Sequence, residues 1–229
     1  MSNLFTSSIG RKLIMSVSGI FLILFLLFHM SMNIAAIFSA EAYNMICELL
    51  GANWYAVAAT LVLVAGVLVH IIYAIVLTIM NRKARGSQRY AVSTREKGVS
   101  WSSKNMLVIG FVVLFGLLIH GYQFWYNMMF VELIGGHTNS VGLSAHDGAG
   151  LIKFYFTQPA YVALYLVWFA AIWFHLTHGF WSMFQTIGWA NTIWLPRLKC
   201  IANIFATIVF LGFAAVVLAT FFSNCPMCA

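Results

Sequence analysis

The amino-acid sequence predicts an all-α integral membrane protein with five transmembrane helices. Of its 229 residues, 62% are hydrophobic and only 7% are charged, so a soluble fold would lack the polar residues needed to cover its surface. The apolar residues also form continuous runs, whereas the strands of a transmembrane barrel alternate apolar and polar residues. Together these observations exclude a soluble enzyme, a disordered chain and a nucleic-acid binder, despite the net charge of +7.

Five apolar stretches reach the length of about 20 residues that a helix needs to cross a bilayer. We expect the spans at residues 13–36, 55–80, 106–130, 160–187 and 201–222, and we expect residues 1–229 to form one domain. The first span follows Arg11 and Lys12, as the apolar part of a signal peptide would. Its apolar run is longer than the roughly 7–15 residues of such a segment, and no A-x-A-like cleavage site follows. We therefore expect this span to be retained.

The basic residues fall almost entirely on one side of the predicted membrane. Eleven of the twelve Lys and Arg residues lie before the first span, between the second and third spans, or between the fourth and fifth. Lys153 lies on the other side, together with Glu41, Glu48, Glu132 and Asp147. The positive-inside rule then predicts a cytoplasmic N-terminus and an external C-terminus.

No Lys, Arg, Asp or Glu lies inside any predicted span. The spans do contain five histidines, which are His29, His70, His120, His175 and His178. Ionisable residues within a membrane are costly and mark functional sites. A single histidine of this kind also fits a hydrogen-bonded contact between helices. Here four different spans each carry at least one, which favours a functional explanation.

The depths of these histidines sort them into two pairs. His29 and His120 lie 16 and 14 residues from the cytoplasmic entries of the first and third spans, or about 24 and 21 Å. His70 and His175 each lie 15 residues from the outer entries of the second and fourth spans, or about 23 Å. The first and third spans thus supply an outer pair, and the second and fourth supply an inner pair.

Two facing imidazoles are the axial ligands of a bis-histidine haem b, whereas zinc takes four ligands, often with Cys or carboxylate. We therefore expect the first four spans to form a bundle around two b haems. Small residues four positions from the histidines share their helix faces and leave room for a flat ring. These residues are Gly66, Ala74, Gly116, Ala171 and Gly179. The alternative is that they only allow the helices to pack closely.

His175 and His178 compete as ligand of the inner haem, because residues three apart share a helix face. The small residues at positions 171 and 179 favour His175. His178 then contacts a haem propionate or a quinone, or is a polar residue of helix packing. Ser16, Ser18 and Ser103 lie near the inner boundary, where they either bind the propionates of the inner haem or cap and pack helices.

Two segments give the chain a resemblance to a known family. They are residues 8–19, SIGRKLIMSVSG, which lead to His29, and residues 174–188, FHLTHGFWSMFQTIG. With five spans, histidines on the first four and a basic loop between the second and third, the whole chain resembles the b558-type cytochrome b subunit of bacterial succinate dehydrogenase and fumarate reductase.

The resemblance implies that His29 and His120 bind the distal haem and that His70 binds the proximal haem. The second proximal ligand in this family is a histidine followed four residues later by glycine, which matches His175 with Gly179. The resemblance also implies a multi-pass protein of the bacterial inner membrane, with two cytoplasmic partners. One is a flavoprotein that holds FAD and the dicarboxylate site, and the other is an iron–sulfur protein.

The family's chemistry implies that electrons pass between a quinone near the outer haem and the iron–sulfur subunit, with menaquinone as the suggested quinone. Quinone chemistry needs a proton acceptor, for which Glu48 is preferred over Glu41. The alternative is that Glu48 and Glu41 are solvated loop carboxylates without a role in proton transfer. His146 and Asp147 are weaker candidates for the proton acceptor.

Two other functions remain open. One is the cytochrome b of a quinone-linked hydrogenase or formate dehydrogenase, and the other is a haem-free transporter that uses its histidines. The sequence leaves open the physiological direction of the reaction, the assembly of complexes into dimers, and the role of Cys225 and Cys228.

Overall fold

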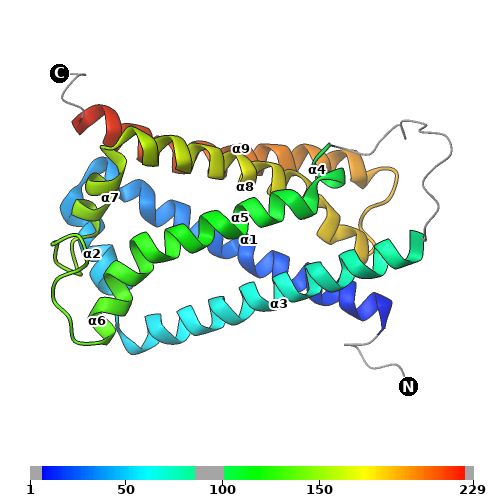
Figure 1. Ribbon diagram of the computed structural model, residues 1–229. Coiled ribbons are helices and arrows are strands. Elements are labelled where there is room, and N and C mark those ends of the chain that lie inside the picture. Colours follow the sequence, from blue (N-terminus) through cyan, green and yellow to red (C-terminus); the bar gives the residue numbers. More distant parts are fainter. Residues whose placement is uncertain (1–6, 86–100, 225–229) are drawn as a thin grey trace.

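The computed structural model describes residues 7–85 and 101–224, and within these ranges it contains helices, turns and one isolated β-bridge, between Thr138 and Ser144. Five helical stretches are long and apolar enough to cross a membrane, which confirms this part of the prediction. They are α1 (Ser8–Phe38), α3 (Trp54–Arg85), α5 (Met106–His120) with its continuation to Leu133, α8 (Pro159–Thr186) and α9 (Trp194–Asn224). They run along the long axis of the molecule (Figure 1).

Local sequence features set the start of α9 and the end of α8. Helix α9 begins at Trp194, not at residue 201, because Pro196 falls in the first turn, where a backbone N–H has no helical acceptor. The side-chain oxygen of Asn191 accepts hydrogen bonds from the N–H groups of Ile193 and Trp194 at this start. Helix α8 ends at Thr186, and Gly188, with φ of +84°, turns the chain away.

Helix α5 continues without a break into a π-helix, η1 (Gly121–Phe130), and then α6 (Val131–Leu133). A π-helical segment changes the faces that successive side chains occupy, and such segments are frequent at functional sites. Here Gln123 and Asn127 are both buried. Asn127 donates to the carbonyls of Tyr122 and Gln123, and its own oxygen accepts from the N–H and the hydroxyl of Ser140. One amide side chain therefore joins the π-helix to the loop that follows it.

Three short helices gather at one end of the molecule, which we call the cap end: α2 (Ala40–Leu49), α6 and α7 (Gly148–Phe156) (Figure 1). Asp147 accepts from the Gly150 N–H and so caps α7. Asn44 of α2 donates to Asp147 at 3.0 Å and accepts from the Ala149 N–H at 2.8 Å. These bonds fasten α2 to α7 across the end of the bundle.

The opposite end, which we call the basic end, holds the start of α1, the end of α3, the short helix α4 (Trp101–Lys104) and the start of α9 (Figure 1). The described basic residues here are Arg11, Lys12, Arg82, Lys83, Lys104, Arg197 and Lys199, together with the backbone of Arg85. Arg89, Arg95 and Lys97 of the predicted basic loop lie outside the described residues, as do Cys225 and Cys228. Helix order thus places nearly all of the basic residues away from the cap end.

Helix α9 forms the centre of the apolar core. It packs along α8 and against α1, while α5 packs on α8, and α3 makes extensive contact with α1 alone among the described elements. Buried side chains of α9, including Val209 and Phe213, meet Phe169 and Ile172 of α8 and Met30 of α1. Because α1 packs on both α3 and α8, and α8 packs on α5, the order around the bundle is α3, α1, α8, α5, which places α1 diagonally from α5 and α3 diagonally from α8.

We predict that Asn127→Ala destabilises the protein, because it removes four hydrogen bonds of a fully buried amide, two of them to Ser140 of the following loop. Each such bond contributes about 0.5–1.5 kcal/mol, so we expect a melting temperature several degrees lower in detergent. Ser31→Ala is the control, because the exposed Ser31 hydroxyl bonds only the Leu27 carbonyl of its own helix. Equal melting temperatures for the two variants would contradict a clamping role for Asn127.

Candidate functional site

The first histidine pair joins α1 to the end of α5. The ring centroids of His29 and His120 lie 5.7 Å apart, with the ring planes at 86°. Aromatic rings surround this pair, which we call the cap-side pair because His29 lies in the part of α1 nearer the cap end. The rings in contact with one of the two histidines are Phe25, Phe124, Tyr165, Trp168 and Phe213.

The second pair joins α3 to α8, the other diagonal of the bundle. The centroids of His70 and His175 are 6.3 Å apart, with the ring planes at 60°. We call this the basic-side pair. The structure therefore brings together the same residues that depth alone grouped in the sequence. His178 is not part of this pair, since its ring stands edge-on to Trp181 at 5.0 Å.

Three helices give the same separation between the two pairs. On α1, Ser18 contacts His70 and lies 11 residues before His29. On α8, Tyr165 contacts His120 and lies 10 residues before His175. On α5, a Cβ added to Gly110 would meet His175, and Gly110 lies 10 residues before His120. At about 1.5 Å per residue, the pairs lie about 15 Å apart along the bundle.

The donor set at each level suits a metal held by two opposed imidazoles. Two such rings stand with centroids about 6 Å apart, because each metal–nitrogen bond is about 2 Å and each ring nitrogen lies about 1 Å from its ring centre. Within residues 7–85 and 101–224, no group of three or more His, Cys, Asp or Glu side chains converges on a metal position. The arrangement thus fits axial ligation of a haem and lacks the four ligands of a structural zinc site.

The basic-side histidines have an unpaired ring nitrogen and glycines beside their rings, and both features suit an additional ligand. The Nδ1 atom of His175 is buried and has no hydrogen-bond partner. Gly19 and Gly110 stand beside the Cε1 atoms of His70 and His175, where an added Cβ would lie 3.7 and 3.9 Å away. These two glycines keep the edges of the imidazoles clear, and neither was singled out from the sequence.

The small residues predicted to leave room for a ring have mixed surroundings. Phe21 of α1 lies over Gly66, and the indole of Trp168 lies over Gly116, so both glycines accommodate an aromatic side chain of a neighbouring helix. An added Cβ at Gly179, by contrast, would meet only Met106, at 3.8 Å. Close helix packing, the alternative explanation for the small residues, therefore accounts for Gly66 and Gly116 in this structure.

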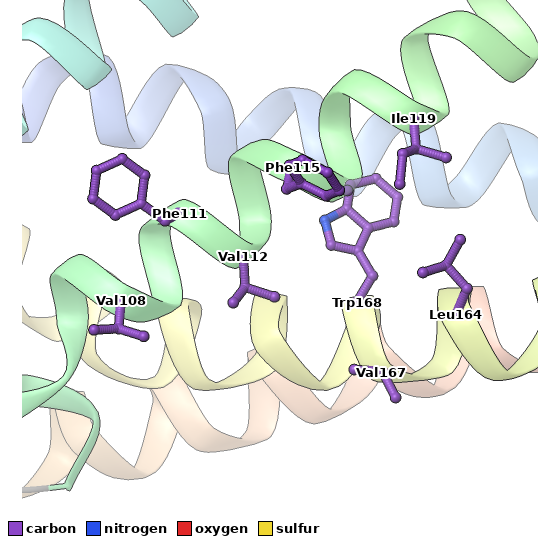
Figure 2. A pocket seen from close by; sticks show the side chains of 9 residues that line it. Val108, Phe111, Val112, Phe115, Ile119, Leu164, Val167 and Trp168 are labelled. Carbon is purple, nitrogen blue, oxygen red and sulfur yellow. The ribbon is translucent and has the colours of Figure 1, made fainter.

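Trp168 also lines an apolar groove between α5 and α8. The groove has a volume of about 370 Å³ and opens to the membrane-facing surface of the two helices. Figure 2 shows Trp168 rising from α8 toward Phe115 and Ile119 of α5. The indole N–H donates to the Val113 carbonyl at 3.0 Å, which fixes the ring against α5. Trp168 thus contacts His120 of the cap-side pair and also lines this apolar groove.

The predicted polar residues outside the pairs take different places. Ser16 is buried and donates to the Lys12 carbonyl of its own helix, which is a packing role. Glu41 and Glu48 lie in the first and last turns of α2, and both are exposed. Two further outer carboxylates hold the cap end together, because Glu132 accepts from the Ala52 N–H and Asp147 caps α7.

Cys47 lies on α2 between Tyr43 and Asp147, outside the membrane-spanning helices. Burial raises the pKa of its thiol to about 11, and the charge of Asp147 acts in the same direction against a hydrogen bond from Tyr43. The thiol is therefore protonated at neutral pH and a poor nucleophile. Cys47 is a packing residue of the cap end.

Two residues beside the cap-side pair were missed from the sequence. The hydroxyl of Tyr165 lies 3.4 Å from Nδ1 of His120 and donates to the side-chain oxygen of Gln123 at 2.7 Å. Gln123 follows His120 by three residues, and Tyr165 precedes His175 by ten. The available signal was the presence of a glutamine inside an apolar span, since polar side chains there commonly pair with one another.

The fold and the two sites define a class: a multi-pass helical membrane chain with two half-buried histidine pairs on the diagonals of its bundle. No family model, curated protein or solved structure matches the chain.

We predict that Gly116→Ala lowers the melting temperature, because the new methyl group would overlap the Trp168 indole. Overpacking of this kind costs about 1–3 kcal/mol. Gly121→Ala is the matched control, since an added Cβ there has no neighbour within 4 Å and alanine favours a helix by about 0.5–1 kcal/mol. Thermal unfolding in detergent should separate the two variants in opposite directions, and a stable Gly116→Ala protein would mean that the indole moves freely.

Proposed function

We propose that this chain is the membrane anchor and electron-transfer subunit of a succinate:quinone oxidoreductase or quinol:fumarate reductase. The observation that carries the proposal is the pair of imidazole contacts, His29–His120 and His70–His175, on the two diagonals of one bundle. Two such pairs about 15 Å apart suit two b haems, one above the other, within a hydrocarbon core about 30 Å thick. Bound there, the haems would supply one-electron transfer between a quinone and an iron–sulfur partner.

The four paired histidines would hold the two irons, and the surrounding apolar side chains would exclude water from them. The basic-side pair would use His175, because His178 contacts Trp181 and not His70. In this proposal His178 remains a packing residue near Lys199, whose ammonium lies over the Trp181 ring at 5.0 Å. The four histidines alone supply the metal ligands in this proposal, so it requires no carboxylate inside the spans.

The distribution of charge supports a polarity for the complex. The basic end carries at least seven cationic side chains, and the cap end carries Glu41, Glu48, Glu132 and Asp147. By the positive-inside rule the basic end would face the cytoplasm of a bacterium, with the chain in the inner membrane. That end would dock the FAD-containing flavoprotein and the iron–sulfur subunit, while menaquinone would react nearer the cap end.

A haem-free transporter is the alternative from another class. A transporter of this kind would need groups that exchange protons or ions with the histidines along a polar path. The cap-side pair is instead enclosed by five aromatic side chains. The cytochrome b of a hydrogenase or formate dehydrogenase is the nearer alternative, and the identity of the co-purifying subunits distinguishes it from the first proposal.

We predict that His29→Ala and His120→Ala each remove one haem, and that His70→Ala and His175→Ala each remove the other. The measurement is the haem-to-protein ratio by pyridine haemochrome, with reduced-minus-oxidised spectra of the purified chain. His178→Ala is the matched control and should keep both haems. Wild-type protein without a b-type α-band would overturn the proposed function, and loss of haem from His178→Ala alone would overturn the choice of His175.

We predict that Glu48→Gln slows quinol turnover while both haems stay bound, because the amide cannot accept the quinol proton. Glu41→Gln is the control, since Glu41 is equally exposed but lies at the opposite end of α2. The assay compares quinol oxidation by the complex with its haem content. An effect of Glu41→Gln alone would transfer the role to Glu41, and normal turnover in both variants would remove α2 from the proton path.

A further inference from the structure

Each histidine pair has one member whose Nδ1 atom faces a buried hydroxyl group. Ser18 of α1 lies 3.2 Å from Nδ1 of His70, and Tyr165 of α8 lies 3.4 Å from Nδ1 of His120. The two hydroxyl-bearing residues are only 7% and 3% exposed. They come from different helices and differ chemically, but they stand in the same relation to their histidines.

The Ser18 hydroxyl donates its proton to the Met15 carbonyl, one turn earlier on α1, at 3.1 Å. A hydroxyl has a single proton to donate and two lone pairs that accept. Toward His70, Ser18 therefore acts as an acceptor, and this requires the proton of the neutral imidazole to sit on Nδ1. The lone pair of His70 is then on Nε2, the nitrogen free to bind a metal.

Tyr165 repeats this arrangement at the other level. Its hydroxyl donates to the side-chain oxygen of Gln123 at 2.7 Å, which is the shorter of its two polar contacts. The remaining lone pair accepts from Nδ1 of His120, so the free lone pair of that ring is also on Nε2. Gln123 is 4% exposed and lies in the first turn of the π-helix. The π-helix thus places the group that orients the Tyr165 hydroxyl.

The opposite member of the basic-side pair has no such support. Nδ1 of His175 is buried without a partner, although Thr177 lies two residues further along α8, where its hydroxyl contacts Ser102 of α4 at 3.5 Å. The hydroxyl contact is therefore specific to His70 within that pair.

We propose that Ser18 and Tyr165 are positioning residues that fix the tautomers of His70 and His120, so that each presents Nε2 to a haem iron. The proposal rests on the proposed function. Hydrogen bonds from the second ring nitrogen of a metal-bound histidine set its orientation and raise its basicity. A more basic ligand stabilises ferric iron, so each hydroxyl would lower the reduction potential of the haem at its own level.

The test is a redox titration of the full-length chain purified from membranes, with Ser18→Ala, Ser18→Thr and Tyr165→Phe. The two haems are first assigned with His70→Ala and His120→Ala, each of which should retain one. Ser18→Ala should raise the midpoint potential of the basic-side haem alone, and Tyr165→Phe should raise that of the cap-side haem alone. Ser18→Thr keeps the hydroxyl and should restore the wild-type value.

Matched controls separate positioning from packing. Ser31→Ala removes an exposed hydroxyl of α1, and Tyr161→Phe removes the hydroxyl of a ring that packs on Tyr155, away from the histidines. Both should leave the two potentials unchanged. Weaker haem binding in Ser18→Ala, by about 10–100-fold as for other lost partners of metal ligands, also supports the proposal if Ser18→Thr reverses it.

The outcomes distinguish this proposal from the proposed function. A wild-type chain without haem would overturn both. Two haems with unchanged potentials in Ser18→Ala and Tyr165→Phe would overturn the tautomer assignment and leave the function standing. Equal shifts in Ser18→Ala and Ser18→Thr, or shifts of both haems in either variant, would assign these residues to packing and also overturn the proposal.

Discussion

The need to give every polar nitrogen a partner in a hydrocarbon environment is the constraint on which the rest of the structure depends. An imidazole carries one donor and one acceptor, and leaving either unpaired among apolar side chains is costly. The membrane-spanning helices offer no Asp, Glu, Lys or Arg near the paired histidines. Partners must therefore come from other histidines, from hydroxyl and amide side chains, or from a bound ligand, and this restricts how the helices face one another.

The bundle meets this constraint by pairing helices across its diagonals. Neighbouring helices, such as α1 with α3 and α5 with α8, are joined by close apolar packing. The histidines connect α1 to α5 and α3 to α8, which packing does not join extensively. The histidines therefore join helices that apolar packing does not, and a ligand bound between them would add contacts that the helices do not make on their own. Helix α9 packs on both α1 and α8 and so stabilises the arrangement of the four histidine-bearing helices.

The sequence predicted those features that follow from hydropathy and helical rise. The five spans, the grouping of His29 with His120 and the grouping of His70 with His175 all follow from counting residues along straight helices. The features that were missed depend on local hydrogen bonds. Asn127 joins the π-helix to the following loop through Ser140, and α9 starts early because Asn191 caps it ahead of Pro196. Two explanations stayed open for the glycines at 66 and 116, because a sequence does not show which neighbouring side chain will fill the space.

The two histidine pairs lie nearer to opposite ends of the molecule and are surrounded by different contacts. At the cap end, Asn44 and Asp147 join α2 to α7, and Asn127 of the π-helix joins the following loop through Ser140, while aromatic rings surround the cap-side pair. Around the basic-side pair, the described contacts lie within the helices, chiefly Ser18 on α1 and the glycines at 19 and 110. Aromatic rings around one pair, and a serine with two glycines beside the other, give the two levels different environments. Two chemically identical imidazole pairs in one chain therefore need not be functionally equivalent, because the fold surrounds each with a different set of groups.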